Sequence, residues 1–93
     1  MSVMIGVKHL SGDEWEVSVQ GAVMTHHRVR VTQADVARLS GTCPTEALIQ
    51  ESFKFLLERE PNTSILTSFD LSLIGRYFPE YEQEIGARLR RSR

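Results

Sequence analysis

Three histidines and one cysteine are the residues of this chain best suited to metal binding or nucleophilic catalysis. His26 and His27 are adjacent, but neighbouring side chains of a strand point to opposite faces, so they cannot easily share a metal ion. Cys43 precedes a proline at an expected helix start, where a thiol gains some reactivity. A catalytic cysteine also needs a base and an orienting group, and nothing in the sequence ties a histidine to Cys43. The sequence therefore predicts no catalytic residue and no metal site.

The surroundings of the carboxylates and the lack of phosphate-binding motifs lead to the same prediction. Five glutamates between positions 58 and 84 lie in polar, charge-mixed surroundings that are typical of a solvated surface: Glu58, Glu60, Glu80, Glu82 and Glu84. Glu84 and Arg88 are four residues apart, which suits an ion pair on a helix surface. Neither GxxxxGK[ST] nor GxGxxG occurs in the chain. We therefore expect a protein that is not an enzyme and that carries no cofactor.

The strongest nucleic-acid candidates are Arg28 and Arg30, which share one face of an expected strand with His26. A two-stranded ribbon that enters a major groove can present arginines to guanine. The formal net charge of −1 instead favours an ordinary solvated strand face, because nucleic-acid-binding domains are usually basic. The basic residues of 88–93 can contact phosphate or simply complement the dipole of the last helix. DNA binding through His26, Arg28 and Arg30 is the alternative function.

Residues 65–78 hold more large apolar side chains than the outer layer of a 93-residue chain needs. All of them can belong to the intrachain core, or the surplus can bury against another chain. Because aromatic residues dominate interface hot spots, we expect five anchors of a protein-binding site: Phe69, Leu73, Tyr77, Phe78 and Tyr81. The main prediction is a small protein-interaction or assembly module with an unidentified protein partner and the capacity to form a homo-oligomer.

Apolar residues at odd positions predict the strands that carry the candidate histidines and arginines. They indicate a three-stranded antiparallel meander over roughly 3–10, 14–20 and 25–32. A turn at residues 11–13 would pair Val7 with Val17. The second turn lies near Gly21 and needs an odd-length loop or a bulge, because an even loop would scramble the two faces.

The rest of the chain predicts helices. Thr32 caps a short helical turn that ends at Gly41, and Pro44 suits the first position of the next helix. A helical stripe then runs over 65–77, as one helix or as two turns broken at Asp70, and a last helix follows it.

Length and composition limit the chain to one small folded domain. It has 93 residues, 41% hydrophobic and 25% charged, which are values typical of globular proteins. Strands followed by helices predict an α+β fold with helices packed on one face of the meander. We expect one domain over 1–93, with the β-meander in 1–32 and the helical part in 33–93. One cysteine, no signal-peptide pattern and no apolar run of about 20 residues predict a cytoplasmic protein without a membrane partner.

The C-terminal half resembles a group of small uncharacterised bacterial proteins. Their pattern runs SFxFLLEREP, then IL, then FDLxxIxRYFPEY. The matching segment begins at Ser52 and reads SFKFLLEREPNTSILTSFDLSLIGRYFPEYEQEI, and the preceding THHRVRVT strand fits the same group. The resemblance implies a bacterial protein but no particular activity.

A second resemblance, to ribbon-helix-helix DNA-binding proteins, rests on the strand HHRVRVT followed by two helices. In that family the strand pairs with its twin in an obligate dimer, and its outward residues read the major groove. The resemblance implies that His26, Arg28 and Arg30 are the readers, as in the repressor half of a toxin–antitoxin pair. The two earlier strands depart from the pattern, because they can pair with this strand inside the chain.

Overall fold

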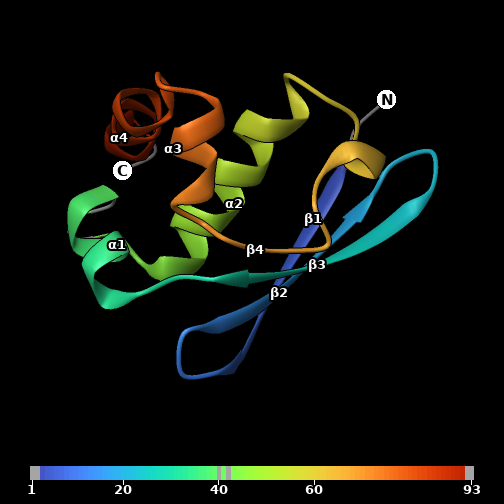
Figure 1. Cartoon of the computed structure of the whole chain (residues 1–93), viewed down its shortest axis with the longest axis horizontal. Coiled ribbons are helices and arrows are strands. Elements are labelled where there is room, and N and C mark those ends of the chain that lie inside the picture. Colours follow the sequence, from blue (N-terminus) through green and yellow to red (C-terminus); the bar gives the residue numbers. More distant parts are fainter. Residues whose placement is uncertain (1–2, 40, 42, 92–93) are drawn as a thin grey trace.

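A computed structural model describes residues 3–39, 41 and 43–91, which form an α+β fold with helices on one face of a sheet (Figure 1). The predicted antiparallel meander is confirmed and consists of β1 (Met4–Ser11), β2 (Glu14–Gln20) and β3 (Met24–Arg30). A short strand that was not predicted, β4 (Ser68–Asp70), runs parallel to β3, so the sheet order is β1-β2-β3-β4.

In the described part of the chain, four helices and one 3-10 turn complete the fold. They are α1 (Gln33–Leu39), α2 (Thr45–Leu57), the turn η1 (Asn62–Ser64), α3 (Leu73–Tyr77) and α4 (Tyr81–Arg91). Figure 1 shows α2 next to the sheet, with α3 and α4 on the same side of it. Helix α2 contacts both β1 and α4, so it links the sheet to the C-terminal helix.

The register of the meander confirms the predicted faces. Val7 pairs with Val17, and Gln20 pairs with Met24, which leaves a three-residue loop around Gly21. Because side chains alternate along a strand, the odd-numbered residues face the helices and the even-numbered ones face away from them. The buried side chains of β2 and β3 are accordingly all odd-numbered.

The predicted cap of the first helix is also confirmed. The Thr32 hydroxyl accepts a hydrogen bond from the Asp35 amide at 3.1 Å, and the Asp35 carboxylate accepts one from the Thr32 amide at 3.2 Å. This reciprocal pair satisfies two amides that a helix start leaves unpaired. Gly41 ends the segment with a φ of 63°, a left-handed conformation that glycine adopts without strain.

The predicted helical stripe over 65–77 is wrong for its first half. Residues 68–70 form β4, and helix α3 begins only at Leu73. The outer edge of β3 determines this outcome, because it offers unpaired backbone groups that an adjacent strand can bond. The Arg28 amide donates to the Thr67 carbonyl at 2.7 Å, and the Leu71 amide donates to the Arg30 carbonyl at 2.9 Å. These long-range bonds override the local helical spacing.

The hydrophobic core lies between the sheet and the helices. Phe53 and Phe55 of α2 are fully buried and belong to the same core cluster as three buried valines of the sheet: Val17, Val19 and Val29. Each such side chain contributes about 1.5–3 kcal/mol relative to an exposed one. Helix α4 closes the other side of α2 with three buried residues: Tyr81, Ile85 and Leu89.

Candidate functional site

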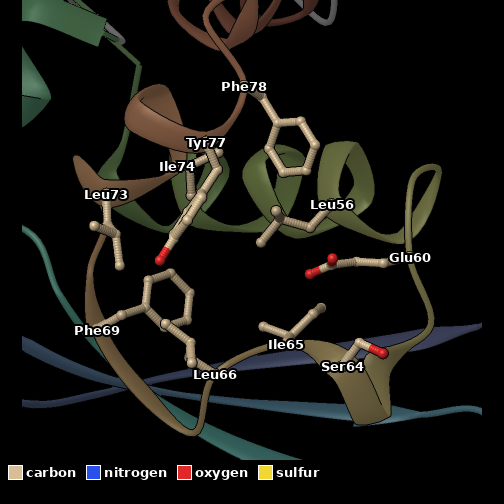
Figure 2. A pocket seen from close by; sticks show the side chains of 10 residues that line it. All are labelled: Leu56, Glu60, Ser64, Ile65, Leu66, Phe69, Leu73, Ile74, Tyr77 and Phe78. Carbon is tan, nitrogen blue, oxygen red and sulfur yellow. The ribbon is translucent and has the colours of Figure 1, made fainter.

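An open pocket of about 430 Å³ lies between the C-terminal end of α2, η1, β4 and α3 (Figure 2). Its lining is mostly apolar and comprises Leu56, Glu60, Ser64, Ile65, Leu66, Phe69, Leu73, Ile74, Tyr77 and Phe78. Four of the five predicted anchors are in this lining: Phe69, Leu73, Tyr77 and Phe78. The segment 65–78 thus does gather its apolar residues in one place, although they do not share one helix.

The fifth predicted anchor, Tyr81, belongs to the core and not to this surface. It is fully buried, and its ring lies edge-on to Phe55 at 5.3 Å. Its hydroxyl is 2.6 Å from the Ser52 hydroxyl, which itself donates to the Leu48 carbonyl. Because a serine hydroxyl carries one proton, the Tyr81 hydroxyl donates and Ser52 accepts. Burial raises the pKa of Tyr81 well above its ordinary value of 10.0.

The pocket has a buried floor and an exposed apolar rim. Leu56, Ile65 and Ile74 are buried and form the floor. Leu66 and Tyr77 are at the rim, and 50% and 67% of their respective surfaces are exposed. Large apolar side chains with this much exposure are unusual next to a concave apolar site, and such patches mark binding surfaces.

A buried hydrogen-bond chain fixes the β3-side wall of the pocket. His27 Nδ1 is 2.7 Å from the Leu66 carbonyl, which can only accept, so Nδ1 carries the proton. In the neutral ring Nε2 then accepts from the Thr25 hydroxyl at 2.9 Å, and Thr25 accepts from Asn62 Nδ2 at 2.9 Å. This chain ties the segment from η1 to Leu66 to β3 and so holds the wall in place.

The opposite wall is held by aromatic packing and one arginine. Phe78 lies edge-on to Phe55 at 5.8 Å, and the Arg59 guanidinium lies 3.6 Å above the Phe55 ring. Arg59 also donates to the Phe55 carbonyl and to the Glu80 carboxylate. All three nitrogens of its guanidinium thus donate to the Phe55 carbonyl or to Glu80, and Arg59 forms no ion pair with the described residues of the pocket lining.

Glu60 is the one charged residue among the described residues of the lining. Figure 2 shows its carboxylate directed into the pocket, opposite Leu66 and Phe69. The other four glutamates of 58–84 have arginine partners: Glu58 with Arg59 and Arg88, Glu80 with Arg59, Glu82 with Arg38, and Glu84 with Arg88. The predicted Glu84–Arg88 pair is thereby confirmed at 3.2 Å. Among the described residues no cation pairs with Glu60, so the pocket combines apolar walls with an unpaired negative charge.

The residues of the DNA-binding alternative lie on the other side of the sheet. His26, Arg28 and Arg30 are exposed on its outward face, as their even positions predict. Arg28 is directly opposite Glu16 of β2, and Arg30 is directly opposite Glu14. Asp70 of β4 flanks Arg30 from the other side. Opposite charges across neighbouring strands stabilise the sheet and leave this face nearly balanced in charge.

The position of β3 also differs from the ribbon-helix-helix arrangement. Over residues 28–30 it is bonded to β2 on one side and to β4 on the other. A strand with both edges occupied by its own chain has no free edge there for a twin strand.

Metal centres and membrane spans are two other kinds of site that residues 3–39, 41 and 43–91 could contain. In this part of the chain no three His, Cys, Asp or Glu side chains come together in a way that could hold a metal ion. Nor does any helix there combine the length and apolar character needed to cross a membrane.

Sequence reasoning missed several members of the pocket. Leu56 and Ile74 follow helical spacing and give no sign that they reach a cavity. Glu60 carries no signal of its own, because it differs from its glutamate neighbours only in lacking an arginine, and that depends on the folded chain. His27 was expected on the opposite face from His26, which is confirmed, but its partner carbonyl is 39 residues away in the sequence.

Comparison of the chain with protein-family models, with curated proteins and with solved structures finds no match. The resemblances to small bacterial proteins and to ribbon-helix-helix proteins therefore stay predictions from the sequence, and the function has to be argued from the site.

Proposed function

We propose that this chain is a small, non-enzymatic protein-interaction module whose pocket receives a large apolar side chain of a partner protein. The observation that carries the proposal is the continuous apolar surface formed by the pocket and its exposed rim residues, Leu66 and Tyr77. Apolar pockets that accept one anchor residue supply most of the affinity in many protein interfaces.

A protein partner fits this pocket better than a buried small molecule does. A volume of about 430 Å³ accommodates a leucine, phenylalanine or tryptophan side chain with room to spare. Small-molecule sites usually enclose most of their ligand, whereas the two exposed rim residues extend the apolar surface beyond this pocket. Contact with a flat partner surface would cover Leu66 and Tyr77 and remove them from water.

Glu60 specifies the charge of that partner. A carboxylate without a cation at the rim of an apolar pocket attracts a positively charged group, and water exclusion strengthens the attraction. A lysine or arginine close to the apolar anchor would satisfy it. We therefore propose that the recognised segment carries a large apolar residue with a basic residue next to it or one helical turn away.

Selection from a random peptide library displayed on phage tests both the apolar anchor and its basic neighbour. The selected peptides should share a large apolar residue and a nearby lysine or arginine. Binding to the full chain, measured by calorimetry, should weaken more than about tenfold in Leu66→Asp, which costs about 1.4 kcal/mol or more. Glu60→Gln should weaken binding of the basic peptides about tenfold and abolish the salt dependence.

Met24→Asp is the matched control for Leu66→Asp. Met24 is 53% exposed and Leu66 50%, but Met24 lies on the outward face of the sheet, away from the pocket. The control should bind the selected peptides with unchanged affinity. Equal loss in both variants, or no loss in either, would refute the pocket as the binding site.

A further inference from the structure

A second surface, independent of the pocket, lies at the other edge of the sheet. The strand order places β1 at this edge, and β2 is its one strand neighbour among the residues that the structure describes. Figure 1 shows β1 behind β2. The backbone groups of β1 that point away from the sheet determine what this edge can bond.

The direction of these groups follows from the bonding of β2. The Asp13 carbonyl accepts from the Val31 amide at 2.8 Å, so odd-numbered residues of β2 bond towards β3 and even-numbered ones towards β1. The β1 partners of the even residues are Met4, Gly6 and Lys8. Bonding groups alternate in an antiparallel strand, so the N–H and C=O groups of the residues in between point outward: Ile5, Val7 and His9.

These outward groups are almost unused. Within the described part of the chain, their one hydrogen bond runs from Gln50 Nε2 to the Ile5 carbonyl, at a long 3.5 Å. The strand has eight residues and contains no proline. Exposed edges of this length invite pairing with another strand unless a bulge, proline or cover protects them. Here the bulge lies only at the end of β1, between His9 and Ser11.

We infer that β1 pairs in antiparallel fashion with β1 of a second copy, with Val7 on the two-fold axis. Val7 then bonds Val7 of the second copy. Ile5 bonds His9 of the second copy, and His9 bonds Ile5 of the second copy. Each of these three pairs exchanges two backbone hydrogen bonds, which makes six in all. The result is one continuous sheet across both copies, with all helices on the same face.

The side chains are self-complementary in this register. On the outward face Lys8 lies opposite Gly6 of the second copy and not opposite the other Lys8. Gly6 has no side chain of its own, and the Ser18 hydroxyl of β2 lies 2.7 Å from the place where a Cβ would stand. Lys8 therefore meets backbone and one hydroxyl across the seam, and Glu16 next to Lys8 on β2 balances the charge. If the two-fold axis passed through Ile5 or His9 instead, some of the outward backbone N–H and C=O groups of β1 would be left unpaired.

The oligomeric state of the full chain gives the first test. Sedimentation equilibrium from about 1 µM to about 500 µM should show a transition from 10.6 kDa to twice that mass. Val7→Pro removes an outward amide and leaves the bonds from β1 to β2 intact, since edge strands tolerate proline at such positions. We expect this variant to raise the dimer dissociation constant at least about tenfold, with an unchanged circular dichroism spectrum.

A cysteine cross-link tests the register and does not depend on whether the proline variant folds. In a Cys43→Ser background, Val7→Cys should form a disulfide-linked dimer on mild oxidation. Paired Cα atoms about 5.5 Å apart are within disulfide range. Met24→Cys in the same background is the control, because Met24 lies in β3, away from the seam, and should not cross-link.

The inference is supported by a dimer that Val7→Cys cross-links and that Leu66→Asp leaves intact. A monomer at every concentration overturns it. It is also overturned by a dimer that Val7→Cys does not cross-link or that Leu66→Asp abolishes, since either result would place the contact elsewhere. The pocket proposal stands or falls separately, because peptide binding is measured on the same variants.

Discussion

His27 lends itself to a quantitative test of how the pocket wall is held. Replacing it with phenylalanine keeps the ring and its contact with Phe53, 5.5 Å between centroids, but removes both nitrogens. Two hydrogen bonds are lost, one to the Leu66 carbonyl and one from the Thr25 hydroxyl. At about 1 kcal/mol for each of the two bonds, plus about 1–3 kcal/mol for a polar group left unpaired in a buried place, the cost is about 3–5 kcal/mol. For a domain of this size, each kcal/mol lowers Tm by about 4–8 °C.

The neighbouring residue supplies a matched control. His26→Phe makes the same chemical change at an exposed position on the outward face, where we expect less than about 0.5 kcal/mol. Urea denaturation at pH 8, followed by circular dichroism, measures both variants. Amide hydrogen exchange gives a local readout, because the Arg28 amide donates to Thr67 next to the wall and should exchange faster in His27→Phe only. Equal stability of the two variants would refute the claim that the His27 chain holds the wall.

Three further predictions concern the rest of the molecule. The Arg88 guanidinium bonds to Glu58 and holds the pKa of that carboxyl below its ordinary 4.5, so this exposed pair stabilises the fold above that pH and ceases to do so in acid. Urea titrations should show Glu58→Gln less stable by under about 1 kcal/mol at pH 7 and equal to the wild type once Glu58 is protonated. Burial raises the pKa of Tyr81, so wild-type stability should fall as pH rises above 10.0, and a pH series in which Tyr81→Phe falls as steeply would contradict this. Because acidic residues lie across the strands from Arg28 and Arg30, fluorescence anisotropy should detect no duplex DNA binding at about 50 mM salt. If duplex DNA does bind, and if replacing both arginines with alanine removes that binding, the DNA-binding alternative is restored.

The strand part of the fold could be predicted because its signal is local. Alternation with a period of two marks the buried face, and a one-residue error would turn every side chain to the wrong side. That constraint was enough to predict the Val7–Val17 pair, and it limited the turn near Gly21 to an odd-length loop or a bulge, of which the structure has a three-residue loop. It also placed His26, Arg28 and Arg30 on one exposed face.

The segment after Pro61 could not be predicted in the same way. Phe69, Leu73 and Tyr77 have helical spacing, yet β3 captures residues 68–70 as a strand through bonds that span about forty residues of chain. Local spacing still brought these three residues to one cluster, because they line the same pocket. Tyr81 has the same spacing and aromatic character but packs into the core, where its ring meets Phe55 and its hydroxyl bonds Ser52, and neither contact can be read from local spacing.

The most direct test of the proposed function is capture from a lysate of the native cells with three baits: the wild-type chain, Leu66→Asp and Met24→Asp. Each capture is run with and without nuclease and read by mass spectrometry. We predict a stoichiometric protein that the wild type and Met24→Asp retain, that Leu66→Asp loses and that nuclease does not remove. A partner that Leu66→Asp retains as well as the wild type does, or one that nuclease releases from every bait, would contradict the pocket as the binding site.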